Sequence, residues 1–142
     1  MKKDILAISG KPGLYKLISR GTNMLIVETL DEQHKRTPAY ATDRVVSVAD
    51  ISIYTDDGED TPLTSVFDNI LKEYEGKAVD LNPKKADNED IIDFFKRALP
   101  NYDADRVRVS DMRKVLSWYN ILVKAGVTDF EEPETEEEKT EG

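Results

Sequence analysis

Short apolar runs separated by polar turns fill the first 55 residues. The runs occupy residues 5–8, 14–18, 24–27, 37–41, 45–48 and 51–54. Runs of this length, rich in β-branched residues and bounded by glycine and polar residues, are typical of β-strands. Short strands joined by tight turns favour a small antiparallel barrel or a strongly bent sheet. We therefore predict a small SH3-like antiparallel β-barrel domain over residues 1–55.

Apolar residues take up a helical spacing in the second half of the chain. Residues 56–63 are polar and acidic and contain Gly58 and Pro62, so we predict a linker there. Beyond it, apolar residues recur every three or four positions in three segments. We predict one helix capped by Thr64 or Ser65 and stopped by Gly76, a second starting near Asp87 or Asn88, and a third capped by Ser110. Three amphipathic helices can share one core. The predicted fold class is α+β, with a helical domain over residues 64–128.

The stretch "ISGKPGLYK" (residues 8–16) has the glycines and lysine of a phosphate-binding loop. A P-loop needs Gly-Lys-Ser/Thr before a helix, which holds the phosphate at its N-terminus. Here Gly10 and Lys11 are followed by Pro12 and by a segment with a β pattern. Residues 11–14 fit a type II turn instead, with Pro12 in the second position and Gly13 in the third. We interpret the stretch as a corner of the sheet.

The net charge of −9 is concentrated at the C-terminal end. Residues 129–142 hold eight acidic residues and one basic residue, whereas residues 1–55 hold six acidic and eight basic residues. A segment as polar as 129–142 cannot bury enough apolar surface to order itself, so we predict a disordered acidic tail. The alternative is that the tail is an acidic mimic that covers a basic surface on residues 1–55.

The residue inventory argues against most catalytic and metal chemistry. The chain has no cysteine and one histidine, His34, which excludes thiolate sites and multi-histidine metal sites. An EF-hand loop starting at Asp103 fails, because its sixth position is Arg108 and its twelfth is Lys114. There is no Gly-x-Ser-x-Gly motif, and the carboxylate pairs lie on faces expected to be solvated. We expect no enzyme, no cofactor and no bound metal.

Aromatic and basic residues offer surfaces for recognition in two places. Tyrosines alternate with lysines and arginines in the β part, and small barrels bind single strands or peptides with such a face. The alternative is that these tyrosines are ordinary strand residues with buried rings. On the third helix Trp118 is either a core residue or an interface anchor. The candidate partner-binding residues are Tyr15, Lys16, Arg20, Lys35, Arg36, Tyr40, Arg44 and Trp118.

Two segments of the chain resemble a known family. These are "ILAISGKPGLYK" (residues 5–16) and "LPNYDADRV" (residues 99–107). Ser110-Asp111 and Trp118-Tyr119-Asn120, which follow the second segment, also match. They look like a family of small uncharacterised proteins found mainly in Bacteroidetes bacteria, over about residues 3–123. The resemblance implies a domain of unknown function with an N-terminal β unit and a C-terminal helical unit. It implies no established activity and a bacterial cytosolic setting.

The function that these observations favour is binding. We expect a non-enzymatic binding or adaptor protein in the cytoplasm, whose partner is another protein that contacts the helical unit or a sheet edge. The apolar runs are too short for a membrane span or a signal peptide. The alternative is RNA binding through the basic, tyrosine-bearing face of the β domain, which would weaken steeply with salt.

Overall fold

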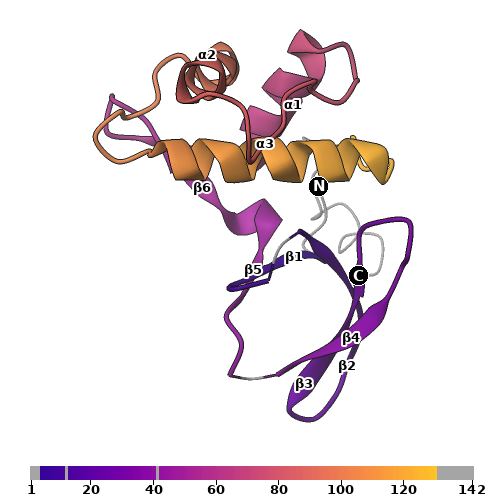
Figure 1. The fold of residues 1–142 in the computed structure, drawn as a ribbon. Helices are drawn as coiled ribbons and strands as arrows, with labels where there is room; N and C mark the ends of the chain where they lie inside the picture. Colours follow the sequence, from indigo (N-terminus) through magenta and orange to yellow (C-terminus); the bar gives the residue numbers. More distant parts are fainter. Residues whose placement is uncertain (1–3, 12, 41, 131–142) are drawn as a thin grey trace, which may run out of the picture.

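The structure is a computed structural model that describes residues 4–11, 13–40 and 42–130. Pro12, in the predicted turn, and residues 131–142, in the predicted tail, lie outside this described part. Figure 1 shows an α+β arrangement in which α3 lies between the other two helices and a curved sheet. The elements are β1 (Ile5–Ile8), β2 (Tyr15–Arg20), β3 (Met24–Thr29), β4 (Arg36–Tyr40), β5 (Val45–Ser47), η1 (Val48–Asp50), β6 (Ser52–Tyr54), β7 (Asp60–Pro62), α1 (Leu63–Glu73), α2 (Asn88–Ala98) and α3 (Val109–Lys124).

Five strands form one antiparallel sheet in the order β4-β3-β2-β1-β5. Within the described residues β4 and β5 are its two edges, so the sheet is open and the closed barrel that we expected is not formed. The reason is that β5 has three residues, pairs only with β1, and passes directly into the 3-10 turn η1. The last predicted strand, β6, leaves the sheet and pairs with β7 inside the predicted linker.

Each face of the sheet has its own role. Tyr15 lies opposite Leu6 of β1 and Thr29 of β3, so these three residues lie on one face of the sheet. Buried side chains on this face form a cluster of their own. We call this cluster the inner core: Leu6, Ile8, Tyr15, Val27 and Ala39, with Leu17, Leu25 and Val45 packed against them. The opposite, outer face carries Ile5, Lys16, Glu28 and Arg36, which the strand register places in one row.

The "ISGKPGLYK" motif connects the antiparallel strands β1 and β2, as we expected of a corner of the sheet. The N–H of Lys11 donates to the carbonyl of Ile8 at 3.0 Å, and Gly10 has a φ of 83°. Gly13 has a φ of 82°, as the third position of a type II turn requires. A strand follows the motif rather than a helix, so no helix N-terminus lies here to hold a phosphate.

The helix boundaries lie close to the predicted starts and stops. α1 ends before Gly76, whose φ is 79° and whose N–H donates to the carbonyl of Leu71 at 2.8 Å. α3 begins one residue before Ser110, the cap that we expected. Asp111 caps it instead, because its carboxylate accepts the N–H of Arg108 at 3.1 Å. A carboxylate at this position also interacts favourably with the helix dipole.

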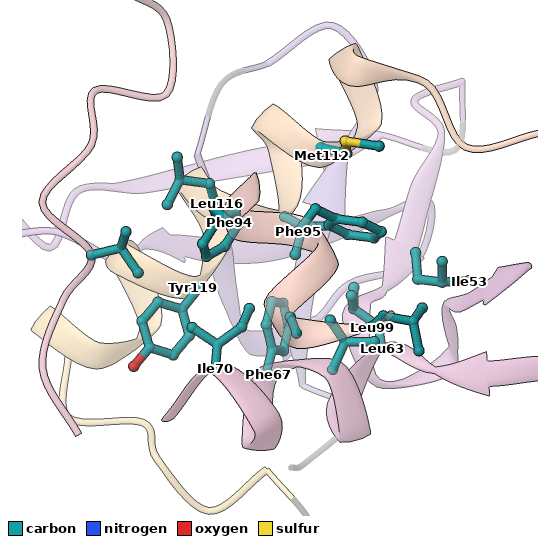
Figure 2. Packing of buried hydrophobic residues seen from close by; sticks show 14 of the residues in the cluster. Ile53, Leu63, Phe67, Ile70, Phe94, Phe95, Leu99, Met112, Leu116 and Tyr119 are labelled. Carbon is teal, nitrogen blue, oxygen red and sulfur yellow. The ribbon is translucent and has the colours of Figure 1, made fainter. Parts of the chain in front are cut away.

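A larger cluster, the main core, is shared by the sheet and the helices. Figure 2 shows Tyr119 of α3 beside residues of α1, among them Phe67. Both side chains are fully buried. Ile5, Leu14 and Val48, from the first fifty residues, belong to the same cluster. The sheet and the helices are therefore joined by one continuous apolar interior.

Phe130 extends the main core beyond α3. Its exposed fraction is 1%, and its ring centroid lies 5.2 Å from that of Phe67 and 6.2 Å from that of Tyr119. From the sequence we predicted this residue to lie in the disordered acidic tail, because acidic residues predominate in residues 129–142 and Phe130 is their one large apolar side chain. The packed chain continues through Phe130.

Side chains of α3 hold the segment between α1 and α2. The side-chain amide of Asn120 accepts the N–H of Val79 at 2.7 Å and donates to its carbonyl at 3.2 Å. The Tyr119 hydroxyl donates to the carbonyl of Lys77 at 2.8 Å. Arg113 donates to two carbonyl groups further along the segment, at 3.1 and 2.7 Å. These bonds supply partners for backbone groups that have no helix or strand to pair with.

Candidate functional site

The structure spreads the eight predicted partner-binding residues over several surfaces. Tyr15 is buried in the inner core, and Trp118 is half-buried against the main core. Tyr40 is 53% exposed on the edge strand β4. The five basic candidates are all exposed and lie on β2, on β4, and in the turns before and after β4: Lys16, Arg20, Lys35, Arg36 and Arg44.

Two of the basic candidates share the outer face with an acidic residue between them. Lys16 pairs with Glu28, and Glu28 pairs with Arg36. The Arg36 Nε atom lies 3.2 Å from Glu28 Oε2. A carboxylate in the middle of the row offsets the attraction that the two cations would exert on a phosphate backbone.

The free edge of β4 is poorly suited to accept another strand. Pro38 has no N–H to donate. The N–H of Tyr40 donates to the Asp43 carboxylate at 2.8 Å, and the Tyr40 carbonyl accepts the N–H of Asp43 at 2.9 Å. Strand addition requires free N–H and C=O groups along the edge. The edge of β4, one candidate for the sheet-edge route, is therefore blocked at these positions.

A groove of about 1170 Å³ opens between the outer face of the sheet and the C-terminal end of α3. One wall is formed by the start of β1 and by β2 and β3, a second by the turn after β3, and a third by the residues that end and follow α3. Ile5, Leu30, Ile121 and Val127 give the groove apolar surface. Concave sites that combine apolar surface with a few polar groups are typical of ligand recognition.

The turn that forms the second wall is fixed by Asp31. Its Oδ1 atom accepts the Thr29 hydroxyl at 2.8 Å and the N–H groups of Gln33 and His34 at 3.0 and 3.1 Å. The bond from Thr29 and those two N–H groups hold the pKa of Asp31 below its ordinary value. His34 has a left-handed φ of 47°, and its Nδ1 atom lies 3.1 Å from Glu28 Oε1. The wall is thus set before any ligand arrives.

Acidic residues predominate around the groove. It is lined by two lysines, Lys16 and Lys124, and by five carboxylates: Asp4, Glu28, Asp31, Glu32 and Asp129. The C-terminal end of α3 adds the partial negative charge of the helix dipole. The groove therefore favours cationic groups.

The groove was not predictable from the sequence, for a physical reason. Only Lys16, among the predicted residues, lines the groove. Its second and third walls lie about ninety residues apart in the chain, and no motif or periodicity links them. They come together because the sheet and α3 share the main core, to which Ile5 and Leu122 both belong. In the part of the chain that the structure describes, no three His, Asp or Glu side chains are placed to hold a metal ion, and no helix is long and apolar enough to cross a membrane.

Comparison with known proteins identifies the class. Residues 51–122 match the family model described as Domain of unknown function (DUF6852), and residues 3–48 match Domain of unknown function (DUF5606). The chain belongs to the DUF6852 family, whose model covers more than half of it. It is similar to a structural-genomics target from Bacteroides vulgatus, solved by solution NMR. The two share 54% sequence identity over 92% of this chain and 91% of the other, with a TM-score of 0.76. No curated protein is similar to the chain. The resemblance to an uncharacterised Bacteroidetes family is confirmed.

Proposed function

We propose that the chain is a non-enzymatic binding protein of the bacterial cytosol that contacts another protein, as an adaptor does. The observation that carries this proposal is the groove beside α3. It joins apolar surface to charged side chains on a wall that hydrogen bonds hold in place. A partner in the groove would touch the sheet and the helical unit together.

The acidic lining supports a protein partner rather than a nucleic acid. Carboxylates outnumber lysines around the groove, and phosphate groups would be repelled there. RNA binding on the outer face is the second candidate, favoured by the exposure of Lys16, Arg36 and Tyr40. Glu28 between the two cations weakens it.

A capture experiment with two matched variants tests the proposal. The tagged full chain is incubated with cytosolic extract of Bacteroides vulgatus, with and without nuclease, and bound proteins and RNA are quantified. Ala125→Arg places a long side chain in the groove directly after α3, whereas Ala104→Arg places the same side chain in the exposed turn before α3.

We expect one discrete protein to be retained by the wild-type chain and by Ala104→Arg after nuclease treatment, and to be lost from Ala125→Arg. RNA that nuclease removes, with no protein left bound, would favour the second candidate. Equal retention by both variants would place the binding surface outside the groove.

A further inference from the structure

We propose that the groove binds a peptide segment carrying both cationic and apolar side chains, that is, lysines or arginines next to residues such as leucine. This inference rests on the proposed function, since it specifies the part of the partner protein that the groove would hold. It follows from two properties of the lining, its charge and its apolar surface.

The charge around the groove is arranged to hold cations from two sides. Glu32 lies in the turn after β3, and Asp129 lies beyond α3 on the opposite wall; both are exposed. Glu28 already contacts His34 and Arg36, so Glu32 and Asp129 are the better-placed contacts for a ligand. The end of α3 between these walls adds negative potential. A lysine or arginine side chain entering the groove would therefore meet negative charge on both sides.

The apolar surface distinguishes a peptide from a simple cation. Leu30, Ile121 and Val127 are half-buried and line the groove together with the charged residues. Burying surface of this kind under apolar side chains is favourable, because it removes apolar area from water. Small hydrated cations would leave it uncovered. A segment that mixes lysine with leucine would satisfy both properties at once.

A labelled peptide tests the inference on the full chain. The probe is a fluorescein-labelled peptide of about twelve residues in which lysine alternates with leucine and serine, and the control peptide has glutamate in place of lysine. Fluorescence anisotropy should show the lysine peptide binding at least tenfold more tightly than the glutamate peptide. Raising the salt concentration tenfold should weaken binding, because it shortens the range of the charge interactions. Equal binding of the two peptides would overturn the inference.

Two charge-reversed double variants locate the binding. Glu32→Lys with Asp129→Lys changes the groove, and Asp93→Lys with Asp105→Lys makes the same change in net charge elsewhere. Asp105 precedes α3, whose sixteen residues separate it by about 24 Å from the end that lines the groove. Asp93 lies on α2, none of whose residues lines the groove. We expect the groove variant to bind about tenfold more weakly and the control less than twofold. Equal losses would show that the peptide follows net charge alone and would overturn the inference.

Three further comparisons test the inference and separate it from the proposed function. A chain that ends at Glu132 should bind the peptide as the full chain does; loss of binding would assign it to the acidic tail and overturn the inference. If the capture experiment finds a protein that Ala125→Arg loses, while the groove reversal leaves peptide binding unchanged, the proposed function stands and this inference fails. If a labelled single-stranded RNA binds more tightly than the peptide and Arg36→Glu abolishes that binding, both fail.

Discussion

Phe130 is expected to contribute a large part of the stability of the fold, although it lies six residues after α3 ends at Lys124. Removing a buried phenylalanine side chain from a core costs about 3–5 kcal/mol. The ring contacts with Phe67 and Tyr119 are worth about 0.5–1.5 kcal/mol each within that total. Residues 125–129, which precede Phe130, are not part of a helix or strand and can adjust to the loss. We therefore expect Phe130→Ala to cost about 3 kcal/mol, at the lower end of this range.

Urea unfolding measures this cost on five chains: the full chain, Phe130→Ala, Phe130→Leu, a chain ending at Glu132 and a chain ending at Asp129. Fluorescence of Trp118, the one tryptophan, reports on the main core, against which it packs. With a slope of about 1.5 kcal/mol per M, a loss of 3 kcal/mol lowers the midpoint by about 2 M. The chain ending at Glu132 should stay within about 0.5 kcal/mol of the full chain, because the residues that it loses lie beyond Phe130.

Three results would refute this reasoning. The first is equal stability of the chains ending at Glu132 and at Asp129. The second is a Phe130→Ala midpoint within error of the full chain. The third is a loss for Phe130→Leu as large as that for Phe130→Ala, since leucine keeps most of the apolar volume and should cost about 1.5 kcal/mol at most.

Three further substitutions probe the helical unit and the corner of the sheet. Asn120→Ala leaves both backbone groups of Val79 without their partner; we expect a loss of about 1–3 kcal/mol and faster hydrogen exchange at the Val79 amide, measured by NMR. Tyr119→Phe removes a hydrogen bond to a loop carbonyl and should cost about 1 kcal/mol near pH 7. Burial, and then the nearby Tyr74, raises the pKa of Tyr119 above 10.0, so wild-type stability should fall as the pH rises from that value through the folded-state pKa. Tyr119→Phe should therefore lose less stability between about pH 9 and 11. Gly10→Ala should cost about 1 kcal/mol in urea unfolding, because Gly10 has a φ of 83° and open space around it, so only the backbone is strained.

Each of these predictions has an outcome that contradicts it. Unchanged exchange at Val79 would show that Asn120 does not hold the α1–α2 segment. If the free energy of unfolding falls equally with pH above 9 in the wild-type chain and in Tyr119→Phe, the buried Tyr119 hydroxyl does not cause the pH dependence. Wild-type stability of Gly10→Ala would mean that the corner relaxes without strain.

Local structure was predictable wherever neighbouring residues determine it. The apolar runs at residues 5–8 and 24–27 and the glycine stop at Gly76 are set by side-chain contacts and backbone geometry within one element, and the structure agrees. The composition of the first 55 residues likewise predicted a β unit. These features need no knowledge of the distant parts of the chain.

Closure of the sheet and the position of the groove depend on distant contacts. Nothing within residues 51–54 indicates that β6 pairs with residues 60–62 rather than with the sheet. Tyr15 and Tyr40 look alike in the sequence, yet the register buries one and exposes the other. The burial of Phe130 was not predicted, because its neighbours in the sequence are acidic. In each case the pairing or burial of the residue depends on contacts with distant parts of the chain, and these contacts cannot be predicted from a single sequence.

The main core contains residues from both of the segments that match family models, residues 3–48 and 51–122. The two segments should therefore depend on each other for stability. Ile5, Leu14 and Val48 come from the first half, and the helices that bury them come from the second. A gene fragment encoding residues 1–48 alone would produce a sheet with these three side chains in water, a substrate for cellular proteases and a seed for aggregation. The two halves should therefore be kept together in one reading frame, and a genome that separates them should also carry a partner that replaces the missing half.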